Sequence, residues 1–279
     1  MYSSLISTQI ALDHLDNLKW RFFDCRYELT APEKKKAEYS VSHIPGALYV
    51  DMKKDLATTH VLGKTGRHPL PSVDEIAMKF SALGIDDSIQ VAVYDDAGGS
   101  HAARLWWILK WLGHDAVAVL DGGWSSWIEE ECPVSSEVLI PESKEFIASP
   151  RLNWIVTADE ILKDLNNPDV CVIDARSVQR FRGENEKLDP VAGHIPGARS
   201  APFTDNLDGN GNWKSKSELR LKFEKLLKGS PAEEVVSYCG SGITACHNIL
   251  AIYHAGLGES RLYPGSWSEW ITNPDRPVE

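Results

Sequence analysis

A glycine-rich loop opens on a cysteine in the segment Ser237-Tyr-Cys-Gly-Ser-Gly-Ile-Thr-Ala-Cys246. A β-branched run precedes the loop and a helical pattern follows it, so we expect it to join a strand to a helix. Two glycines allow a tight turn whose backbone N–H groups face inward, and such a cradle at a helix N-terminus stabilises a thiolate. We therefore predict that Cys239 is a nucleophile. The loop positions expected to hold the substrate are Gly240, Gly242, Ile243 and Thr244.

The other four cysteines lie in segments of ordinary structural character. Cys25 and Cys171 belong to or adjoin strand-like runs, Cys132 lies between the halves of the chain, and Cys246 falls within the predicted helix. An odd number of cysteines without Cys-x-x-Cys pairs argues against a disulfide framework and a zinc site. We expect all four to be structural, with a resolving thiol as the alternative for Cys246.

Three motifs occur twice, in the same order in both halves of the chain. They are Asp24-Cys-Arg26 with Asp174-Ala-Arg176, His43-Ile-Pro-Gly-Ala47 with His194-Ile-Pro-Gly-Ala198, and Leu120–Trp127 with Leu262–Trp270. Ordered self-similarity indicates a duplicated domain. Because both copies share these motifs, we expect them to be structural, with the Asp and Arg side chains tying strand ends to loops and the tryptophans in the core.

Short apolar runs alternate with helical patterns in each half, as in an α/β protein. The expected strands are Gln90–Tyr94, Ala116–Leu120, Val170–Ile173 and Glu234–Tyr238, and the expected helices are Val73–Leu83, His101–Leu112, Glu218–Lys228 and Thr244–Ala255. Continuous β-branched runs suit parallel sheets that are covered on both faces. Ser72 with Glu75, and Thr157 with Glu160, have the spacing of capping boxes that start helices.

The domain boundaries follow from a change in composition near the middle of the chain. Residues 134–152 contain prolines and charges with only scattered apolar side chains, and we interpret them as a linker. We predict two tandem α/β domains, at residues 1–133 and 153–279. Asp95 follows Tyr94 in the first domain where Cys239 follows Tyr238 in the second. An aspartate cannot carry out sulfur chemistry, so we predict that the first domain is catalytically silent.

Taken together, these motifs resemble the two-domain rhodanese superfamily of sulfurtransferases over nearly the whole chain. The resemblance implies two rhodanese-like domains, each a mainly parallel sheet flanked by helices. Thiosulfate sulfurtransferases of this superfamily typically carry Cys-Arg-Lys-Gly-Val-Thr, and 3-mercaptopyruvate sulfurtransferases carry Cys-Gly-Ser-Gly-Val-Thr. The loop Cys239-Gly-Ser-Gly-Ile-Thr244 is similar to that of the mercaptopyruvate branch. A loop without fixed cations suits a singly charged carboxylate better than the thiosulfate dianion.

The resemblance also implies a cation for the donor carboxylate. The family binds it with an Arg in a Gly-Arg-Phe-Arg-Gly-like segment, which places Arg180 of Gln179-Arg-Phe-Arg-Gly183 in that role. The family's second Arg, several residues further on, has no match here. Lys187 or Arg182 is the expected substitute.

A Ser-His-Asp relay is implied for the same branch. Its serine corresponds to Ser241, and its histidine comes from a first-half segment that resembles Gly66-Arg-His-Pro-Leu-Pro71, which indicates His68. Asp51 and Asp55 are the two candidates for the relay aspartate. The resemblance does not choose between them.

The composition limits the classes of partner that the protein is expected to bind. With 29 basic and 40 acidic residues the chain has a net charge of −11, and it has no basic stripe, so we expect no nucleic acid and no membrane surface as a partner. No signal-peptide pattern or apolar stretch of membrane-spanning length occurs, which favours a cytoplasmic protein. The expected partners are a small sulfur donor and a thiol acceptor such as thioredoxin or glutathione, with no metal or organic cofactor.

We expect sulfur transfer from 3-mercaptopyruvate through a persulfide on Cys239, with release of pyruvate and transfer to cyanide or a thiol. The nearest alternative is a thiosulfate sulfurtransferase that releases sulfite. A cysteine phosphatase is disfavoured because the position six residues after the cysteine, where an Arg would clamp the phosphoryl group, is Ala245. A non-catalytic persulfide carrier is a remote alternative, since the loop is intact.

Overall fold

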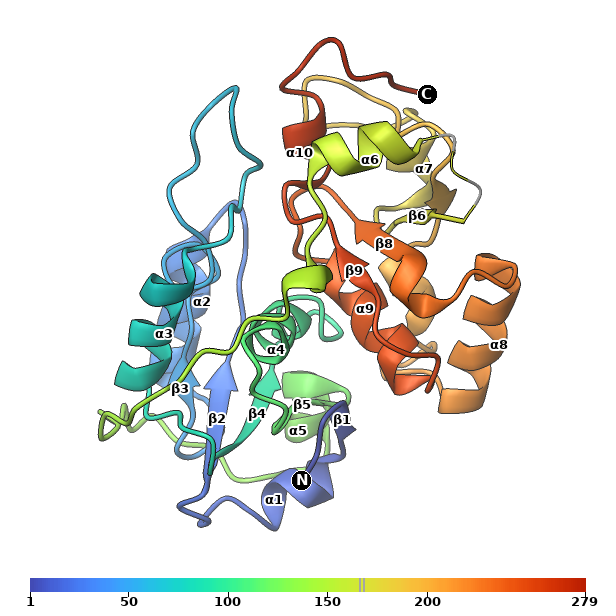
Figure 1. The fold of residues 1–279 in the computed structure, drawn as a ribbon. Coiled ribbons are helices and arrows are strands. Elements are labelled where there is room, and N and C mark those ends of the chain that lie inside the picture. Colours follow the sequence, from blue (N-terminus) through green and yellow to red (C-terminus); the bar gives the residue numbers. More distant parts are fainter. Residues whose placement is uncertain (166, 168) are drawn as a thin grey trace. The chain divides into compact units, whose positions relative to one another are not determined.

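Two parallel sheets organise the chain, one in each half (Figure 1). The structure is a computed structural model and describes residues 1–165, 167 and 169–279. It divides into two compact units. The first unit comprises Met1–Ala57, Pro71–Arg151 and Asn210–Asn212, and the second comprises Thr58–Leu70, Leu152–Gly209 and Trp213–Glu279. The short segment Thr58–Leu70 thus packs with the second unit although its neighbours in sequence belong to the first.

The first unit is built on a five-stranded sheet in the order β1-β5-β4-β2-β3, with all neighbours parallel. Its strands are β1 (Leu5–Ile6), β2 (Trp20–Asp24), β3 (Leu48–Tyr49), β4 (Gln90–Tyr94) and β5 (Val117–Leu120). Its helices are α1 (Thr8–Leu12), α2 (Pro32–Val41), α3 (Val73–Ala82), α4 (Ala102–Trp111) and α5 (Gly123–Glu129). Every residue of β4 and β5 is buried, which explains their unbroken apolar sequences.

The second unit repeats this plan with a four-stranded parallel sheet in the order β7-β6-β8-β9. Its strands are β6 (Cys171–Asp174), β7 (Arg199–Ser200), β8 (Val235–Tyr238) and β9 (Arg261–Leu262). Its α-helices are α6 (Ala158–Asp164), α7 (Val178–Phe181), α8 (Lys216–Leu227), α9 (Ala245–His254) and α10 (Ser266–Trp270), and the 3-10 turns are η1 (Leu152–Trp154), η2 (Phe203–Asn206) and η3 (Ala232–Glu234).

The predicted α/β class, the four strands and the four helices are confirmed, with ends shifted by one or two residues. The capping boxes of Ser72 with Glu75 and of Thr157 with Glu160 both form. The predicted start of α8 at Glu218 is wrong by two residues. Ser215 caps this helix and Glu218 returns a hydrogen bond to it, so the helix begins at Lys216.

The duplicated Asp-x-Arg motif forms the same buried ion pair in both units, as expected for a structural element. Arg26 binds Asp24 through Nε and Nη2 and donates to the carbonyl of Ser42. Arg176 binds Asp174 in the same way and donates to the carbonyl of Gly193. Each guanidinium therefore ties the end of a strand to the loop that carries the His-Ile-Pro-Gly motif. The repeated tryptophans lie against these arginines, with the guanidinium of Arg26 4.4 Å from the ring centroid of Trp124 and that of Arg176 4.7 Å from that of Trp267.

The predicted linker at residues 134–152 lies mostly along the first unit. Ser135 and His43 exchange backbone hydrogen bonds, and Lys144 pairs with Asp86 at 2.7 Å. The ring of Phe146 packs edge-on against Phe80, with centroids 5.2 Å apart. Among the described residues, no helix is long and apolar enough to cross a bilayer.

Candidate active site

The Cys239 loop lies at the carboxyl end of β8 and leads directly into α9. Cys239 is buried, with 2% of its surface exposed. The backbone N–H of Gly242 donates to its sulfur at 3.1 Å. Gly242 has φ +81°, a conformation that favours glycine and turns this N–H toward the thiol. The loop therefore places a hydrogen-bond donor on the sulfur of Cys239, the predicted nucleophile.

The start of α10 holds the outer side of this loop. The N–H groups of Trp267 and Ser268 donate to the carbonyls of Cys239 and Gly240 at 2.9 and 3.0 Å. Because α10 binds these carbonyl oxygens, the N–H groups of the same two peptides face away from α10, on the side left for the thiol and its substrate. This contact between two distant segments orients the cradle, and it was not predicted.

Ser266 is a further residue that sequence reasoning missed. Its φ is +55°, which is uncommon for a residue with a side chain, and it is fully buried. Its Oγ accepts the N–H of Cys239 at 3.1 Å and donates to the carbonyl of Tyr263 at 2.9 Å. The only available signal was the second-half segment Leu262–Trp270, where Ser266 precedes the repeated tryptophan.

Ser241 and His68 are brought together by the segment Thr58–Leu70. Nδ1 of His68 lies 2.9 Å from Oγ of Ser241, and both side chains are buried. The segment is held close because Gly66 lies against the backbone of Gly265, where any Cβ would clash with the carbonyl oxygen. The N–H of the next residue in this segment donates to Oγ of Ser268 at 3.0 Å. Two of the three predicted relay residues thus share a hydrogen bond.

Arg180 lies beside the same loop. Its guanidinium donates to Glu186 from Nε at 2.9 Å and to Asp189 from Nη2 at 3.0 Å. A Cβ added at Gly240 would lie 3.4 Å from Nη1 of Arg180, so the head group faces the loop at the residue after the cysteine. This position is compatible with binding the carboxylate of a small substrate near the sulfur.

The two carboxylates that hold Arg180 respond differently to their surroundings. Burial opposes ionisation of Glu186, but the N–H of Leu188 and the guanidinium of Arg180 outweigh it and hold the pKa of Glu186 below its usual value. Burial raises the pKa of Asp189, which Arg67 and Arg180 counteract only in part. Glu186 is therefore a firmly ionised anchor for Arg180 near neutral pH.

Among the described residues, no contact places Arg182 or Lys187 near the loop. Both are exposed, and the nearest acidic partner of Arg182 is Glu184 at 3.9 Å. The second guanidinium beside Gly240 belongs instead to Arg67, whose Nη2 would lie 2.8 Å from a Cβ at that position. Sequence reasoning missed Arg67, although it directly precedes His68.

Asp51 and Asp55 both make local contacts in the first unit. Oδ1 of Asp51 accepts the N–H groups of Lys53 and Lys54 at 2.8 and 2.9 Å. Asp55 accepts the N–H of Asp51 and pairs with Lys79 at 3.2 Å. These local contacts do not choose between the two candidates, and the relay aspartate stays a prediction.

The last two loop positions lead into α9, and the other cysteines lie in structural surroundings. Ile243 is buried and Thr244 begins α9 as its N-cap residue. All five cysteines, each within the described ranges, are free. Burial raises the pKa of the Cys25 and Cys171 thiols, which keeps them protonated and unreactive. Cys246 is buried and donates from Sγ to the carbonyl of Gly242 at 3.3 Å.

Comparison with known proteins decides the family. The model of the rhodanese-like domain matches the chain twice, at residues 7–130 and 157–273. The chain belongs to the rhodanese-like family. This confirms the resemblance drawn from the duplicated motifs and the cysteine loop.

Relatives extend this result over the whole length of the chain. A probable 3-mercaptopyruvate sulfurtransferase of Pseudomonas aeruginosa is 43% identical over 277 residues, covering 99% of this chain and 98% of the relative. A thiosulfate sulfurtransferase of Mus musculus is 33% identical, covering 97% of this chain and 93% of the relative. The solved structure of 3-mercaptopyruvate sulfurtransferase from Leishmania major is 32% identical, covers 99% of this chain and 75% of its own, and superimposes with a TM-score of 0.86.

The first rhodanese-like domain fills the equivalent cradle with its own carboxylate. Asp95, 1% exposed, accepts four backbone N–H groups of the loop that follows β4. The donors are Ala97, Gly99, His101 and Ala102, at 2.7 to 2.8 Å. The loop after β4 therefore binds the carboxylate of Asp95 through backbone N–H groups, at the position where the second domain carries Cys239.

This arrangement predicts a large stability effect. An Asp95→Ala variant would leave four N–H groups, two of them buried and two half-buried, without their acceptor, and we expect it to lose about 3–5 kcal/mol of unfolding free energy in urea titrations. Asp96→Ala is the matched control. It removes only the half-buried pair with Lys35, which keeps Glu38 as a partner, so we expect a loss of about 1 kcal/mol or less. Equal losses in the two variants would contradict the assigned role of Asp95.

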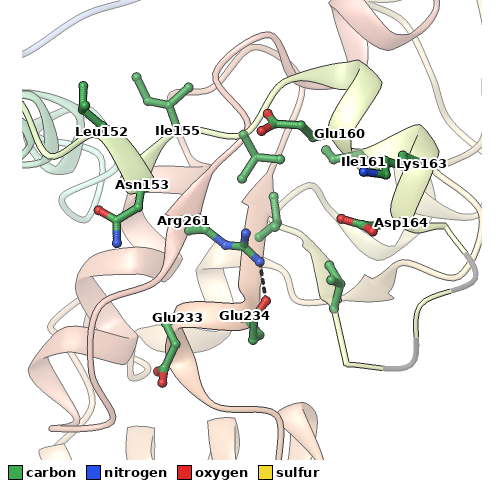
Figure 2. Close-up of a pocket in the computed structure, with 13 residues that line it drawn as sticks. Leu152, Asn153, Ile155, Glu160, Ile161, Lys163, Asp164, Glu233, Glu234 and Arg261 are labelled. Atoms are coloured by element: carbon green, nitrogen blue, oxygen red, sulfur yellow. Dashed lines mark hydrogen bonds and ion pairs between the residues drawn. The ribbon is translucent and has the colours of Figure 1, made fainter.

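A cavity of about 540 Å³ in the second domain lies away from this chemistry (Figure 2). It is lined by Val170, Glu234, Val236 and Arg261, among others, which lie at or near the amino ends of β6, β8 and β9. Figure 2 shows Arg261 paired with Glu234, at 2.9 Å. Because the strands are parallel, Cys239 lies at their opposite end.

Proposed function

We propose that this rhodanese-like protein transfers sulfur from 3-mercaptopyruvate to a thiophilic acceptor through a persulfide on Cys239. The observation that carries this proposal is the Cys239-Gly-Ser-Gly-Ile-Thr244 loop with an N–H group on the thiol and the His68 and Ser241 pair beside it. The names of the relatives support the reaction class.

The first half-reaction forms the persulfide. The Cys239 thiolate attacks the sulfur of 3-mercaptopyruvate, an S–S bond forms, and the C–S bond breaks with its electrons going to carbon. The resulting enolate takes a proton and leaves as pyruvate. In the second half-reaction an acceptor attacks the outer sulfur, and the Cys239 thiolate is regenerated.

Each neighbouring group has a role that follows from its position. The N–H of Gly242 stabilises negative charge on the inner sulfur. Arg180 binds and orients the donor carboxylate. Ser241, hydrogen-bonded to His68, delivers the proton that the departing enolate requires.

For the acceptor, we propose a small or protein thiol such as thioredoxin or glutathione. A persulfide enzyme with five free cysteines fits a reducing compartment, which we take to be the cytoplasm. Thiosulfate as the donor is the second candidate. The 33% identity to a thiosulfate sulfurtransferase of Mus musculus supports this second candidate.

The test is a side-by-side steady-state assay with cyanide as the acceptor. We expect kcat/KM for 3-mercaptopyruvate to exceed that for thiosulfate by more than about tenfold, since the loop residues themselves carry no charge. Thiocyanate formation and pyruvate release report the two half-reactions separately. A preference for thiosulfate would overturn the assignment of the donor and leave sulfur transfer itself in place.

A further inference from the structure

We propose that Arg67 is the second cation that binds the donor carboxylate in this chain, so that the carboxylate is held between Arg67 and Arg180 above Gly240. This inference rests on the proposed function, since it names a further specificity-determining residue of the same site. Arg67, from the segment Thr58–Leu70, then takes the role of the second carboxylate-binding cation, which the residues that follow Arg180 in the sequence leave unfilled.

The geometry brings guanidinium nitrogens of both arginines close to one residue of the loop, Gly240. A Cβ built on Gly240 would lie 2.8 Å from Nη2 of Arg67 and 3.4 Å from Nη1 of Arg180. Within the described part of the chain, neither of these two nitrogens donates a hydrogen bond to the protein. A Cβ at residue 240 would press on the head group of Arg67, so glycine at this position lets both guanidinium groups lie against the loop.

Both arginines are held in place by their other nitrogens. Asp189 accepts Nη1 of Arg67 on one oxygen and Nη2 of Arg180 on the other, and its side chain is only 3% exposed. The backbone of Arg67 is fixed as well, because its N–H donates to Ser268. The two head groups are therefore ordered before substrate binds, which lowers the entropic cost of binding.

The charge of the cluster selects the kind of anion. Glu186 and Asp189 offset much of the positive charge of the two guanidinium groups. Such a site binds through directed hydrogen bonds to a planar monoanion rather than through strong net charge. A 2-oxo carboxylate fits these conditions better than a tetrahedral dianion.

The experiment compares two sulfur donors that differ only in the carboxylate, 3-mercaptopyruvate and mercaptoacetone. We expect Arg67→Gln to lower kcat/KM for persulfide formation from 3-mercaptopyruvate by about 10- to 100-fold, mainly through KM, and to change the reaction of mercaptoacetone by less than about twofold. Arg220→Gln, at an exposed arginine of α8, is the control and is expected to change neither.

A titration with pyruvate separates this proposal from the proposed function, because it needs no turnover. We expect the dissociation constant of pyruvate to rise about tenfold or more in Arg67→Gln and not in Arg220→Gln. Equal losses for both donors, unchanged pyruvate binding, or a carboxylate-specific loss in Arg182→Gln or Lys187→Gln instead would overturn the role of Arg67. A wild-type protein that forms no persulfide would overturn the proposed function, and the pyruvate titration would still decide the role of Arg67.

Discussion

A Cys239→Ser variant is expected to form no persulfide and to lose at least about 10⁴-fold in kcat/KM with either donor. The serine hydroxyl would occupy the same buried position, but a hydrogen bond from the N–H of Gly242 cannot make an alkoxide accessible near neutral pH. The expected product of the wild-type protein after one turnover without acceptor is a protein heavier by one sulfur atom. Mass spectrometry of the intact protein makes this measurement directly.

Two other cysteines provide matched controls for this prediction. Cys132→Ser removes a partly exposed thiol of the first unit and is expected to leave persulfide formation unchanged. Cys246→Ser removes the buried thiol that donates to the carbonyl of Gly242. If Cys246 has only a structural role, its variant keeps the persulfide on Cys239. Retention of sulfur by Cys239→Ser at the wild-type rate would show that another residue is the nucleophile.

The second large effect is expected at the hydrogen bond between His68 and Ser241. We expect His68→Gln and Ser241→Ala each to lower kcat for 3-mercaptopyruvate by about 10²- to 10⁴-fold, the range for a positioned proton donor. The enolate formed from 3-mercaptopyruvate must take a proton, whereas sulfite leaves thiosulfate as a stable anion. Persulfide formation from thiosulfate is therefore expected to change much less in both variants.

A double variant that combines His68→Gln with Ser241→Ala tests whether the two residues act together. Because Nδ1 of His68 and Oγ of Ser241 lie 2.9 Å apart, the two residues are expected to act as one unit, and removing both costs little more than removing either. Single-turnover rates with both donors test this expectation. Equal losses with both donors would assign the pair to the structure of the loop, and additive losses would assign the two residues to separate steps.

A candidate nucleophile could be chosen from the sequence because its signal is local. A cysteine followed by two glycines within four residues, placed between a strand and a helix, fixes a turn whose N–H groups face inward. The strands and capping boxes could also be predicted, since hydrophobic periodicity and helix caps depend on residues that are neighbours in sequence. The ends of helices were less certain, as the start of α8 at Lys216 shows.

Arg67 illustrates what sequence reasoning could not find. The resemblance implies that the second cation lies a few residues from Arg180 in the sequence, which left Arg182 and Lys187 as the candidates. Both proved to be exposed, while Arg67, more than a hundred positions away in sequence, lies beside Gly240. Spacing along a chain carries no information about such a pair, because a loop of any length can close it at small additional cost in free energy.

The sequence by itself determined the duplication and the α/β class, and it led to the prediction that only the Cys239 loop is reactive. Each of these depends on residue types and short-range order. Only the tertiary structure decided that Thr58–Leu70 packs with the second unit, that Ser266 and α10 hold the loop from outside, and that two guanidinium groups meet above Gly240. The physical reason is that these contacts arise from packing between segments distant in sequence, where a glycine without a side chain admits a backbone or a charged head group.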